Sequence, residues 1–229
     1  MAALNEMALL VSFENRIDED INKQVIALHE SLGKQPFDGF IESVPAYASL
    51  AVFYNLIVVK KNCKDNITAF EWVKMVVEEL IAGIENDVVA REAETIIIPV
   101  YYEGQDLESL ARLHQLSAED VIQIHTEKIY RVFMIGFLPG FAYMGKVDER
   151  IATPRHAVPR INVKAGSVGI AGLQTGIYPV SSPGGWQLIG QTPIKIFDTS
   201  REKPCLLKAG DKIQFTPISK QEFDNSNEY

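Results

Sequence analysis

Apolar residues recur at helical spacing in the first part of the chain. In residues 18–32 the intervals between apolar positions are three or four residues, which is the spacing of one face of an α-helix. Acidic residues open this segment and Gly33 follows it, and both features are typical of helix ends. A second helix is predicted after Thr68, because Thr68 and Glu71 have the spacing of a capping box and an apolar face follows them.

Short runs rich in apolar and β-branched residues predict strands around these helices. They cover residues 7–13, 37–44, 49–59 and 94–102. The resulting order, β-α-β-β-α-β, is that of a ferredoxin-like α/β sandwich. The last strand could equally open a second domain.

The pattern changes after residue 102. Two short helices are predicted, over 106–114 and 117–126, the second with a capping-box variant at Ser117. Beyond Tyr130 only short β-rich runs remain, separated by Gly and Pro, and this pattern predicts a compact β-barrel or sandwich. These runs cover residues 130–137, 167–171, 193–197 and 212–216, and the polar tail after Pro217 is predicted to be frayed. We therefore expect an α+β protein with an α/β domain over 1–92 and a β-barrel domain over 93–229.

Composition favours a soluble globular protein. The chain has 229 residues, of which 47% are hydrophobic and 23% charged, and this suits one large domain or two small ones. No apolar run reaches the roughly 20 residues of a membrane helix, and no export signal is visible at the N-terminus. Cys63 and Cys205 are too far apart for a Cys-x-x-Cys metal site, and two cysteines make no disulfide framework. A reducing cytoplasm therefore fits best.

Charge is unevenly distributed along the chain. The net charge of −8 argues against nonspecific binding to nucleic acid or to an anionic membrane. Residues 1–92 hold eight basic and fifteen acidic side chains, whereas the remainder holds fourteen and fifteen. The window from Arg150 to Phe197 contains five basic residues and no acid, and ten of the fifteen glycines lie between Gly136 and Gly190. This window predicts a surface that binds a small anion.

Familiar catalytic and metal-binding motifs are missing. The sequence has no G-x-x-x-x-G-K-[ST] phosphate loop, no G-x-S-x-G elbow and no H-E-x-x-H pair. Three of the four histidines stand on predicted helices, where packing or capping is the favoured role. His156 differs because it stands between Arg155 and Arg160, and the flanking cations are expected to lower its pKa and favour the neutral base.

The candidate site lies in three segments of the basic window, residues 153–160, 172–179 and 182–187. Prolines restrict the backbone beside Arg155 and Arg160, and guanidinium groups at fixed positions suit carboxylates, carboxyphosphate or phosphorylated intermediates. Neutral hydrogen-bonding groups of the kind that recognise an amide or lactam come from Gln174, Thr175 and Tyr178.

The remaining candidates are glycines and an aromatic residue. Gly184 and Gly185 would let the backbone approach a ligand closely, and Trp186 offers a flat apolar wall. An alternative interpretation is a barrel whose Trp and Tyr residues are core and whose glycines form hairpin turns. It accounts for the glycines, but it accounts poorly for the paired Pro-Arg units and for the missing acids.

Five segments of the second part carry a family resemblance. They are GFLPGFAYMG (136–145), TPRHAVPR (153–160), AGSVGIAGLQTGIYPV (165–180), SPGGWQLIGQTPIKIFD (182–198) and LLKAGDKIQF (206–215). Together they resemble the B subunit of bacterial ATP-dependent 5-oxoprolinase, a family that also includes the sporulation-kinase inhibitor KipI. They are similar too to allophanate hydrolase subunit 1 and to one half of the carboxyltransferase domain of urea carboxylase.

The resemblance implies a ferredoxin-like α/β domain followed by a cyclophilin-like β-barrel. It implies partners, a C-type carboxyltransferase-like subunit and an A-type subunit, that open the lactam of 5-oxoproline to L-glutamate with ATP. The ATP site need not lie wholly in this chain. In such an enzyme Arg155, Arg160 and His156 are the expected catalytic residues for a small anionic substrate. The expected substrate-binding residues are Gln174, Thr175, Tyr178, Gly184, Gly185, Trp186 and Phe141.

Two other functions stay open. A KipI-type inhibitor of a sensor histidine kinase would be a regulatory binding protein without chemistry of its own, and the lack of a complete catalytic set speaks for it. A carboxyltransferase half that acts with biotin would need a biotinylated carrier protein nearby.

Overall fold

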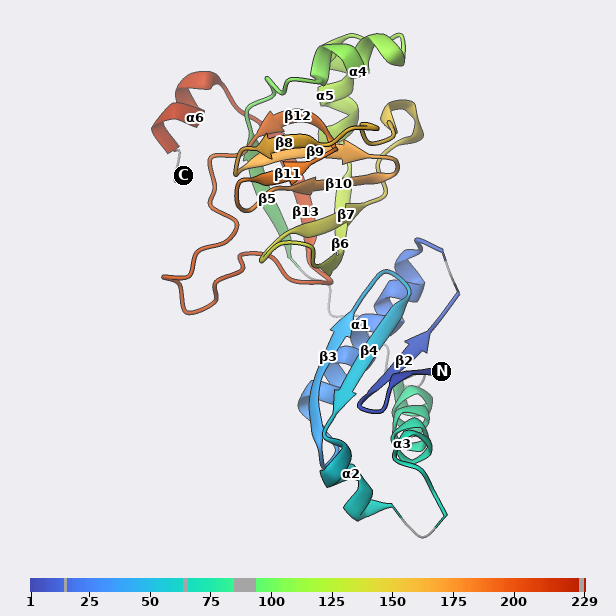
Figure 1. Cartoon of the computed structure of the whole chain (residues 1–229). Coiled ribbons are helices and arrows are strands. Elements are labelled where there is room, and N and C mark those ends of the chain that lie inside the picture. The colour runs from blue at the N-terminus through green and yellow to red at the C-terminus, as the bar shows by residue number, and fades with distance from the viewer. Residues whose placement is uncertain (15, 64–65, 85–93, 227–228) are drawn as a thin grey trace. The chain divides into compact units, whose positions relative to one another are not determined.

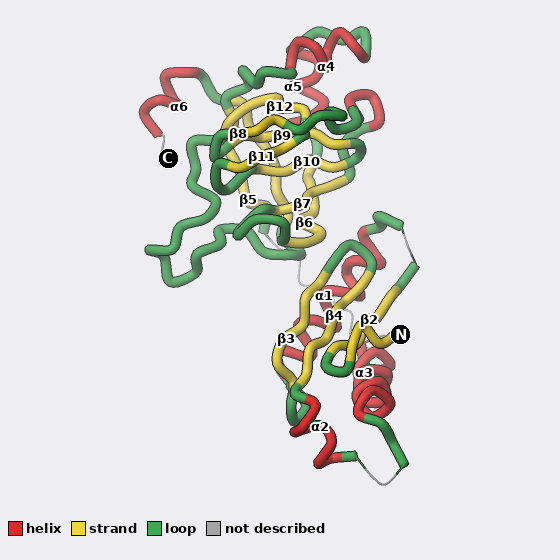
Figure 2. Tube along the Cα trace, viewed as in Figure 1, coloured by secondary structure: helices red, strands yellow, loops and turns green. Residues whose placement is uncertain are grey.

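The computed structural model of the protein describes residues 1–14, 16–63, 66–84, 94–226 and 229. The chain divides into two compact units, Met1–Glu92 and Ala93–Tyr229 (Figure 1). The predicted domain boundary between residues 92 and 93 lies outside the described residues. Helices and strands occur in both units, so the protein is mixed α/β (Figure 2).

The first unit is a four-stranded antiparallel sheet with helices packed on one face. The strand order is β1-β2-β4-β3. Side chains from alternate strand positions and from the two long helices share one buried cluster that includes Leu9, Leu50, Val25 and Val73. The elements are β1 (Ala2–Asn5), β2 (Ala8–Ser12), α1 (Glu19–Lys34), β3 (Phe40–Pro45), β4 (Ser49–Tyr54), α2 (Leu56–Asn62) and α3 (Ala69–Ile84).

Side-chain caps start the two long helices where the sequence predicts them. The Asp18 carboxylate accepts hydrogen bonds from the backbone N–H groups of Asp20 and Ile21. Thr68 and Glu71 form the predicted reciprocal box, in which each side chain bonds the other residue's backbone N–H. The predicted stop at Gly33 is wrong, because α1 continues through Gly33 to Lys34. Glycine costs a helix only about 1 kcal/mol, too little to end it while Leu32 is buried beside it.

The strands of this part differ from the prediction at two places, and the structure decides between the two domains left open for the last predicted strand. The run predicted over 49–59 ends at Tyr54, since the Asn55 side chain accepts from the N–H groups of Ile57 and Val58 and starts α2. An additional strand, β1, pairs with β2 at the edge of the sheet. The strand predicted over 94–102 is β5 (Thr95–Val100), and it belongs to the second unit.

The second unit is built on a curled seven-stranded sheet with the order β12-β9-β10-β7-β6-β13-β5. Its two ends meet where Tyr101, just after β5, forms an antiparallel bridge with Gln191 of β12. A two-stranded sheet, β11-β8, is separate from it. The strands are β6 (Ile129–Ile135), β7 (Ala142–Gly145), β8 (Arg160–Val163), β9 (Ser167–Ala171), β10 (Gln174–Ile177), β11 (Ser182–Gly184), β12 (Gln187–Gln191) and β13 (Lys212–Pro217).

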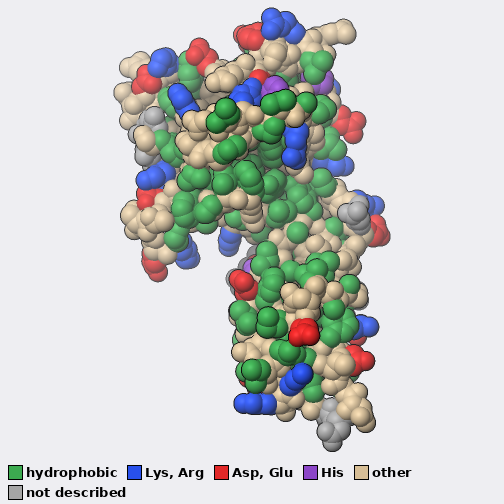
Figure 3. Space-filling view, in the orientation of Figure 1, with side chains coloured by type: hydrophobic (Ala, Val, Ile, Leu, Met, Phe, Trp, Pro, Cys, Tyr) green, Lys and Arg blue, Asp and Glu red, His purple; other side chains and the backbone are tan. Residues whose placement is uncertain are grey.

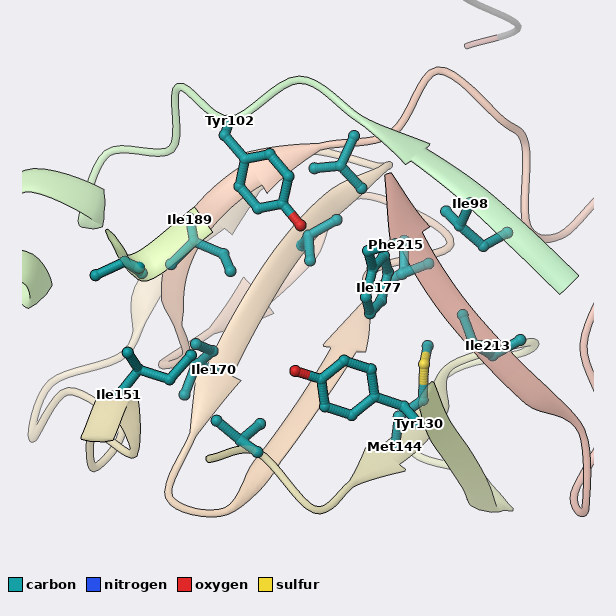
Figure 4. Close-up of a cluster of buried hydrophobic side chains, with 14 of the residues drawn as sticks. Ile98, Tyr102, Tyr130, Met144, Ile151, Ile170, Ile177, Ile189, Ile213 and Phe215 are labelled. Atoms are coloured by element: carbon teal, nitrogen blue, oxygen red, sulfur yellow. The ribbon is translucent and has the colours of Figure 1, made fainter. Parts of the chain in front are cut away.

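Two short helices, α4 (Leu107–Leu113) and α5 (Ala118–Thr126), lie at one end of the curled sheet (Figure 1). The Ser117–Asp120 capping box at the start of α5 is confirmed. The inner face of the sheet and these helices enclose the main core, where isoleucines surround Tyr102, Tyr130 and Phe215 (Figure 4).

Two further predictions for the second unit are wrong. Residues 193–197 are not a strand, and only Phe197 makes an isolated bridge, to Cys205. The tail after Pro217 is not frayed throughout, because α6 (Lys220–Ser226) forms there and buries Phe223 against Tyr101. A reciprocal Ser219–Glu222 box starts α6, a signal that the polar composition concealed.

Candidate functional site

The segment 153–160 of the predicted anion-binding window is fixed at two points. The backbone N–H of His156 donates to the Gly185 carbonyl at 2.6 Å, and the Gln187 side-chain amide donates to the Pro154 carbonyl at 2.7 Å. Arg155, between the two anchored residues, is exposed, and His156 is half-buried. The turn beyond His156 leads into β8, which begins at Arg160 and pairs with β11.

Arg160 forms an ion pair with Asp106, a residue outside the basic window. The Nη2 atom of Arg160 lies 2.5 Å from Oδ1 and 2.7 Å from Oδ2 of Asp106, and its Nη1 donates to the Trp186 carbonyl at 3.1 Å. The acid-free window of the sequence is therefore not free of acids in space. This guanidinium is already occupied, which leaves Arg155 as the more accessible cation of the predicted pair.

Sequence reasoning missed Asp106 as a site residue. Asp106 stands at the N-cap of α4, but its side chain makes no capping bond there and is only 8% exposed. Instead Oδ2 accepts the backbone N–H of Leu188 in β12 at 2.6 Å. Gly104 permits this arrangement, because a Cβ at that position would lie 2.3 Å from the Leu188 carbonyl oxygen. The only sequence signal at Asp106 was its position at the start of a predicted helix.

His156 completes this cluster. Its Nε2 lies 3.3 Å from Asp106 Oδ1 and 3.2 Å from Arg160 Nη2, and its side chain is 35% exposed. An imidazole that borders a carboxylate on one side and solvent on the other has the surroundings of a proton-transfer group.

Arg155 has no ion pair with any carboxylate in the described ranges. Its charge acts on Tyr143 and Tyr178: burial raises the pKa of each phenol, and the nearby guanidinium opposes that shift. A guanidinium that is not paired with a carboxylate and lies near aromatic rings can bind a carboxylate or phosphate as a bidentate partner.

The predicted aromatic residues form a packed cluster on the outer face of the sheet. The Phe141 ring meets Tyr178 at 5.2 Å and Trp186 at 5.3 Å, both edge to face. Trp186 is 6% exposed, and Phe141 and Tyr178 are each 1% exposed. Hydrophobic side chains gather on this face of the second unit around β7, β9 and β10 (Figure 3). Trp186 and Tyr178 are therefore packed as core residues, as the alternative interpretation of the sequence predicted.

Gly184 and Gly185 differ in their surroundings. A Cβ on Gly184 would lie 2.3 Å from the Tyr178 hydroxyl oxygen, so this glycine makes room for a tyrosine of the chain itself. The Trp186 backbone N–H donates to that same hydroxyl. Gly185 has no atom closer than 3.4 Å to such a Cβ, and its carbonyl anchors His156.

Thr175 points into the interior, away from the candidate segment. Its hydroxyl donates to the Gly169 carbonyl at 3.1 Å and lies 2.9 Å from His125 Nε2. Tyr102 bonds the other ring nitrogen of His125 at 2.7 Å, and its hydroxyl points into the core (Figure 4). Burial lowers the pKa of His125 to about 3, so the ring is neutral. Gln174, next in the strand, faces the outer side with Ala171, its partner in β9.

Neither a metal-binding cluster nor a membrane-spanning helix occurs in the described part of the chain. Among the described residues, no group of three or more His, Cys, Asp or Glu side chains has an arrangement that could hold a metal ion. None of the helices in the described ranges combines the length and apolar character of a membrane span.

Residues 1–207 match the family described as carboxyltransferase domain, subdomain C and D. The chain therefore belongs to this family. Within it, the chain is 46% identical to the 5-oxoprolinase B subunit of Bacillus subtilis (strain 168), over 96% of this chain and 93% of that protein.

Solved structures agree with this assignment. The crystal structure of TTHA0988 superposes with a TM-score of 0.80 at 33% identity, over 93% of this chain. This chain spans only 40% of the TTHA0988 chain. The urea amidolyase of K. lactis has the same fold at 18% identity, with a TM-score of 0.70 over 96% of this chain and 15% of the amidolyase.

Proposed function

We propose that this chain is the B subunit of an ATP-dependent 5-oxoprolinase, which opens the lactam of 5-oxo-L-proline to L-glutamate together with A- and C-type subunits. The observation that carries the proposal is the 46% identity to the 5-oxoprolinase B subunit of Bacillus subtilis across nearly the full length of both chains. The chain is then part of a hydrolase assembly in the cytoplasm. ATP is used by the assembled complex, with a site that need not lie wholly in this chain.

The proposed fold assignment is a ferredoxin-like first domain and a cyclophilin-like second domain. The packing of α1 and α3 on one face of an antiparallel sheet supports the first. The curled sheet, whose ends meet at Tyr101 and Gln191, supports the second.

The proposed substrate contacts lie around Arg155 and His156. Arg155 pairs with the carboxylate of 5-oxoproline or with a phosphorylated intermediate, since it is exposed and no described carboxylate occupies it. His156 transfers protons, and Gln174 bonds the lactam amide from the outer face. Phe141 and Trp186 form the apolar support of this site.

The remaining predicted site residues act through the scaffold in this proposal. Arg160 holds Asp106, and Tyr178 and Gly184 pack against each other. Gly185 anchors the loop at His156, and Thr175 belongs to the interior network.

The experiment is reconstitution. The A- and C-type subunits from the same source are assayed for 5-oxoproline-dependent ADP release with and without this chain. The proposal predicts that release requires the chain, and release that is unchanged in its absence would refute it. The KipI-type alternative predicts instead that the chain binds a sensor histidine kinase and leaves ADP release unaffected.

A further inference from the structure

The sheet of the first unit has one face that no described helix of that unit covers. Helices α1 and α3 pack on the other face, where Leu9 and Val52 belong to the buried cluster. Alternate residues of a strand point to opposite sides of a sheet, so the positions between these two form a second, outer face. In the view of Figure 1, β3, β4 and β2 lie in front of α1.

The strand register gathers apolar residues on this side. Leu10, Ala51 and Val44 form one row across β2, β4 and β3. In the next row Phe53 pairs with Ala8 and faces a bulge in β3. Hydrophobic side chains gather over these strands in the space-filling view (Figure 3). We call this surface the outer sheet face, and it consists of Ala8, Leu10, Ile41, Val44, Ala51 and Phe53.

The outer sheet face has the composition of a covered surface. An antiparallel sheet with one side in water usually alternates apolar and polar residues along each strand. Here β2 reads ALLV over 8–11 and β4 reads LAVFY over 50–54, which are the continuous apolar runs of strands covered on both sides. Yet Ile41 is 60% exposed and Val44 is 43% exposed. A contiguous exposed apolar patch of this kind marks an interaction surface.

A second copy of this chain fits the face poorly. Four strands about 4.8 Å apart and about five residues long present roughly 300–500 Å². Two copies would therefore bury roughly 600–1,000 Å², less than the ~1,200 Å² of a standard interface. A two-fold contact would also bring two acidic edges together, because Glu42 stands beside Ile41 and residues 1–92 hold eight basic against fifteen acidic side chains. The occupant is then a different protein, with an apolar centre and a basic rim.

Relatives of this chain carry its fold beside further protein. The family match is to subdomains C and D of a carboxyltransferase domain, and this chain spans only 40% of the TTHA0988 chain. The rest of TTHA0988 is polypeptide that is permanently joined to the same fold. Permanent interfaces are more apolar than transient ones, as the outer sheet face is.

We propose that the outer sheet face is the docking surface for the C-type subunit, and that Glu42 at its edge pairs with a basic side chain of that partner. This inference rests on the proposed function, which supplies the C-type subunit as a partner. It adds the place of contact on this chain and the chemistry of the partner's surface.

The test measures the Kd between the full chain and the C-type subunit by isothermal titration calorimetry. Val44→Glu places a carboxylate without a partner in the apolar centre, so we expect Kd to rise about 100-fold or more. Ile41→Glu should repeat this loss. Met75→Glu is the matched control, because Met75 is 50% exposed but lies on α3, which packs on the other side of the sheet. An unchanged Kd in Val44→Glu and Ile41→Glu, or an equal loss in Met75→Glu, would overturn the proposal.

Two measurements on the chain alone separate the other occupants. The urea midpoint of Val44→Glu should stay close to that of the unaltered chain, and a sharp fall would mean that another part of the same chain covers the face. Sedimentation of the unaltered chain should show a monomer. A dimer that Val44→Glu dissociates would assign the face to a second copy, and either of these contrary results would refute docking of the C-type subunit there.

The charge of the rim has its own variant. Glu42→Lys should weaken binding of the C-type subunit about tenfold at low salt and less at high salt, since an acidic edge then no longer faces a basic one. Tighter binding by Glu42→Lys would contradict the basic rim of the partner.

Activity distinguishes this inference from the proposed function. In the assembled subunits, Val44→Glu should lose ADP release at low subunit concentration and recover it at concentrations above its raised Kd. If the unaltered chain binds the C-type subunit but the complex shows no 5-oxoproline-dependent ADP release, the proposed function fails while the docking surface stands. If the complex is active and Val44→Glu binds as tightly as the unaltered chain, the docking surface is refuted and the proposed function stands.

Discussion

Asp106 and Arg160 stand 54 positions apart in sequence, yet Arg160 Nη2 is in hydrogen-bonding contact with both oxygens of the Asp106 carboxylate. The pair joins the start of α4 to the start of β8, and Asp106 also bonds the backbone of β12 through Leu188. It therefore fixes the base of the segment that carries Arg155 and His156.

Removal of the Asp106 carboxylate should destabilise the second unit. Asp106→Ala leaves the partly buried Arg160 charge and the Leu188 N–H without their acceptor, and we expect a loss of about 2–3 kcal/mol, somewhat below the usual cost of breaking a fully buried pair. Urea unfolding followed by Trp186 fluorescence in a Trp72→Phe background measures this loss. Adding Arg160→Ala should restore part of the stability, because no unpaired charge then remains. A strictly additive double variant would show that the two residues are not coupled.

Gly184 and Gly185 offer a matched pair for the packing of the aromatic cluster. Gly184→Ala forces a Cβ against the Tyr178 ring and hydroxyl and should cost about 1–3 kcal/mol, the usual range for overpacking. Gly185→Ala meets only ordinary van der Waals contacts and should cost much less. Urea midpoints of the two variants make the comparison, and equal losses would contradict the assigned packing.

Gly33 should be a site of easy stabilisation. It lies inside α1, and a Cβ there would have no atom within 4 Å. Gly33→Ala is expected to stabilise the first unit by about 0.5–1 kcal/mol through helix propensity alone. Urea unfolding followed by Trp72 in a Trp186→Phe background tests this, and a destabilised variant would mean that α1 does not continue through residue 33.

The buried His125 should make the stability of the second unit depend on pH. Burial lowers its pKa in the folded state to about 3, whereas the unfolded value is near 6.5. The unfolded state therefore binds more protons between these values, and stability that is complete above pH 6.5 is lost as the pH falls toward 3, by up to about 1.4 kcal/mol per pH unit.

His125→Gln removes this titration. The variant should be less stable at neutral pH, because the Tyr102 and Thr175 hydroxyls lose their partner. Between pH 6.5 and 5, however, its free energy of unfolding should vary less steeply than that of the unaltered chain, as followed by Trp186 fluorescence. Parallel pH profiles for the two proteins would show that His125 is not neutral in the folded state.

Much of the secondary structure was predictable because its signals are local. Thr68 with Glu71 and Ser117 with Asp120 are reciprocal caps that the sequence spacing reveals, and both form. Asn55 is a cap as well, but it follows the β-branched and aromatic run of β4 and precedes Val58 and Val59, so the run concealed the change from strand to helix.

The candidate site was only partly predictable, because its central relationship is long-range. The sequence located the segment with Arg155, His156 and Arg160, yet no local pattern indicates that Asp106 pairs with Arg160 across 54 positions. Strand alternation likewise separates Gln174 from Thr175, which face opposite sides of β10. Which of the two side chains faces the interior is known only when the register of the sheet is known.

Kinetics of Arg155 variants test most directly the claim that this segment binds the substrate anion. Initial rates of ADP release by the assembled subunits are measured against 5-oxoproline concentration for the unaltered chain, Arg155→Lys and Arg155→Ala. We predict that Arg155→Ala raises KM at least tenfold, which corresponds to about 1.4 kcal/mol of lost binding. The KM of Arg155→Lys should lie between that of Arg155→Ala and that of the unaltered chain. Because Arg155 is exposed, neither variant should change the free energy of unfolding. An Arg155→Ala complex with unaltered KM and kcat would contradict the assignment of this segment as the substrate site.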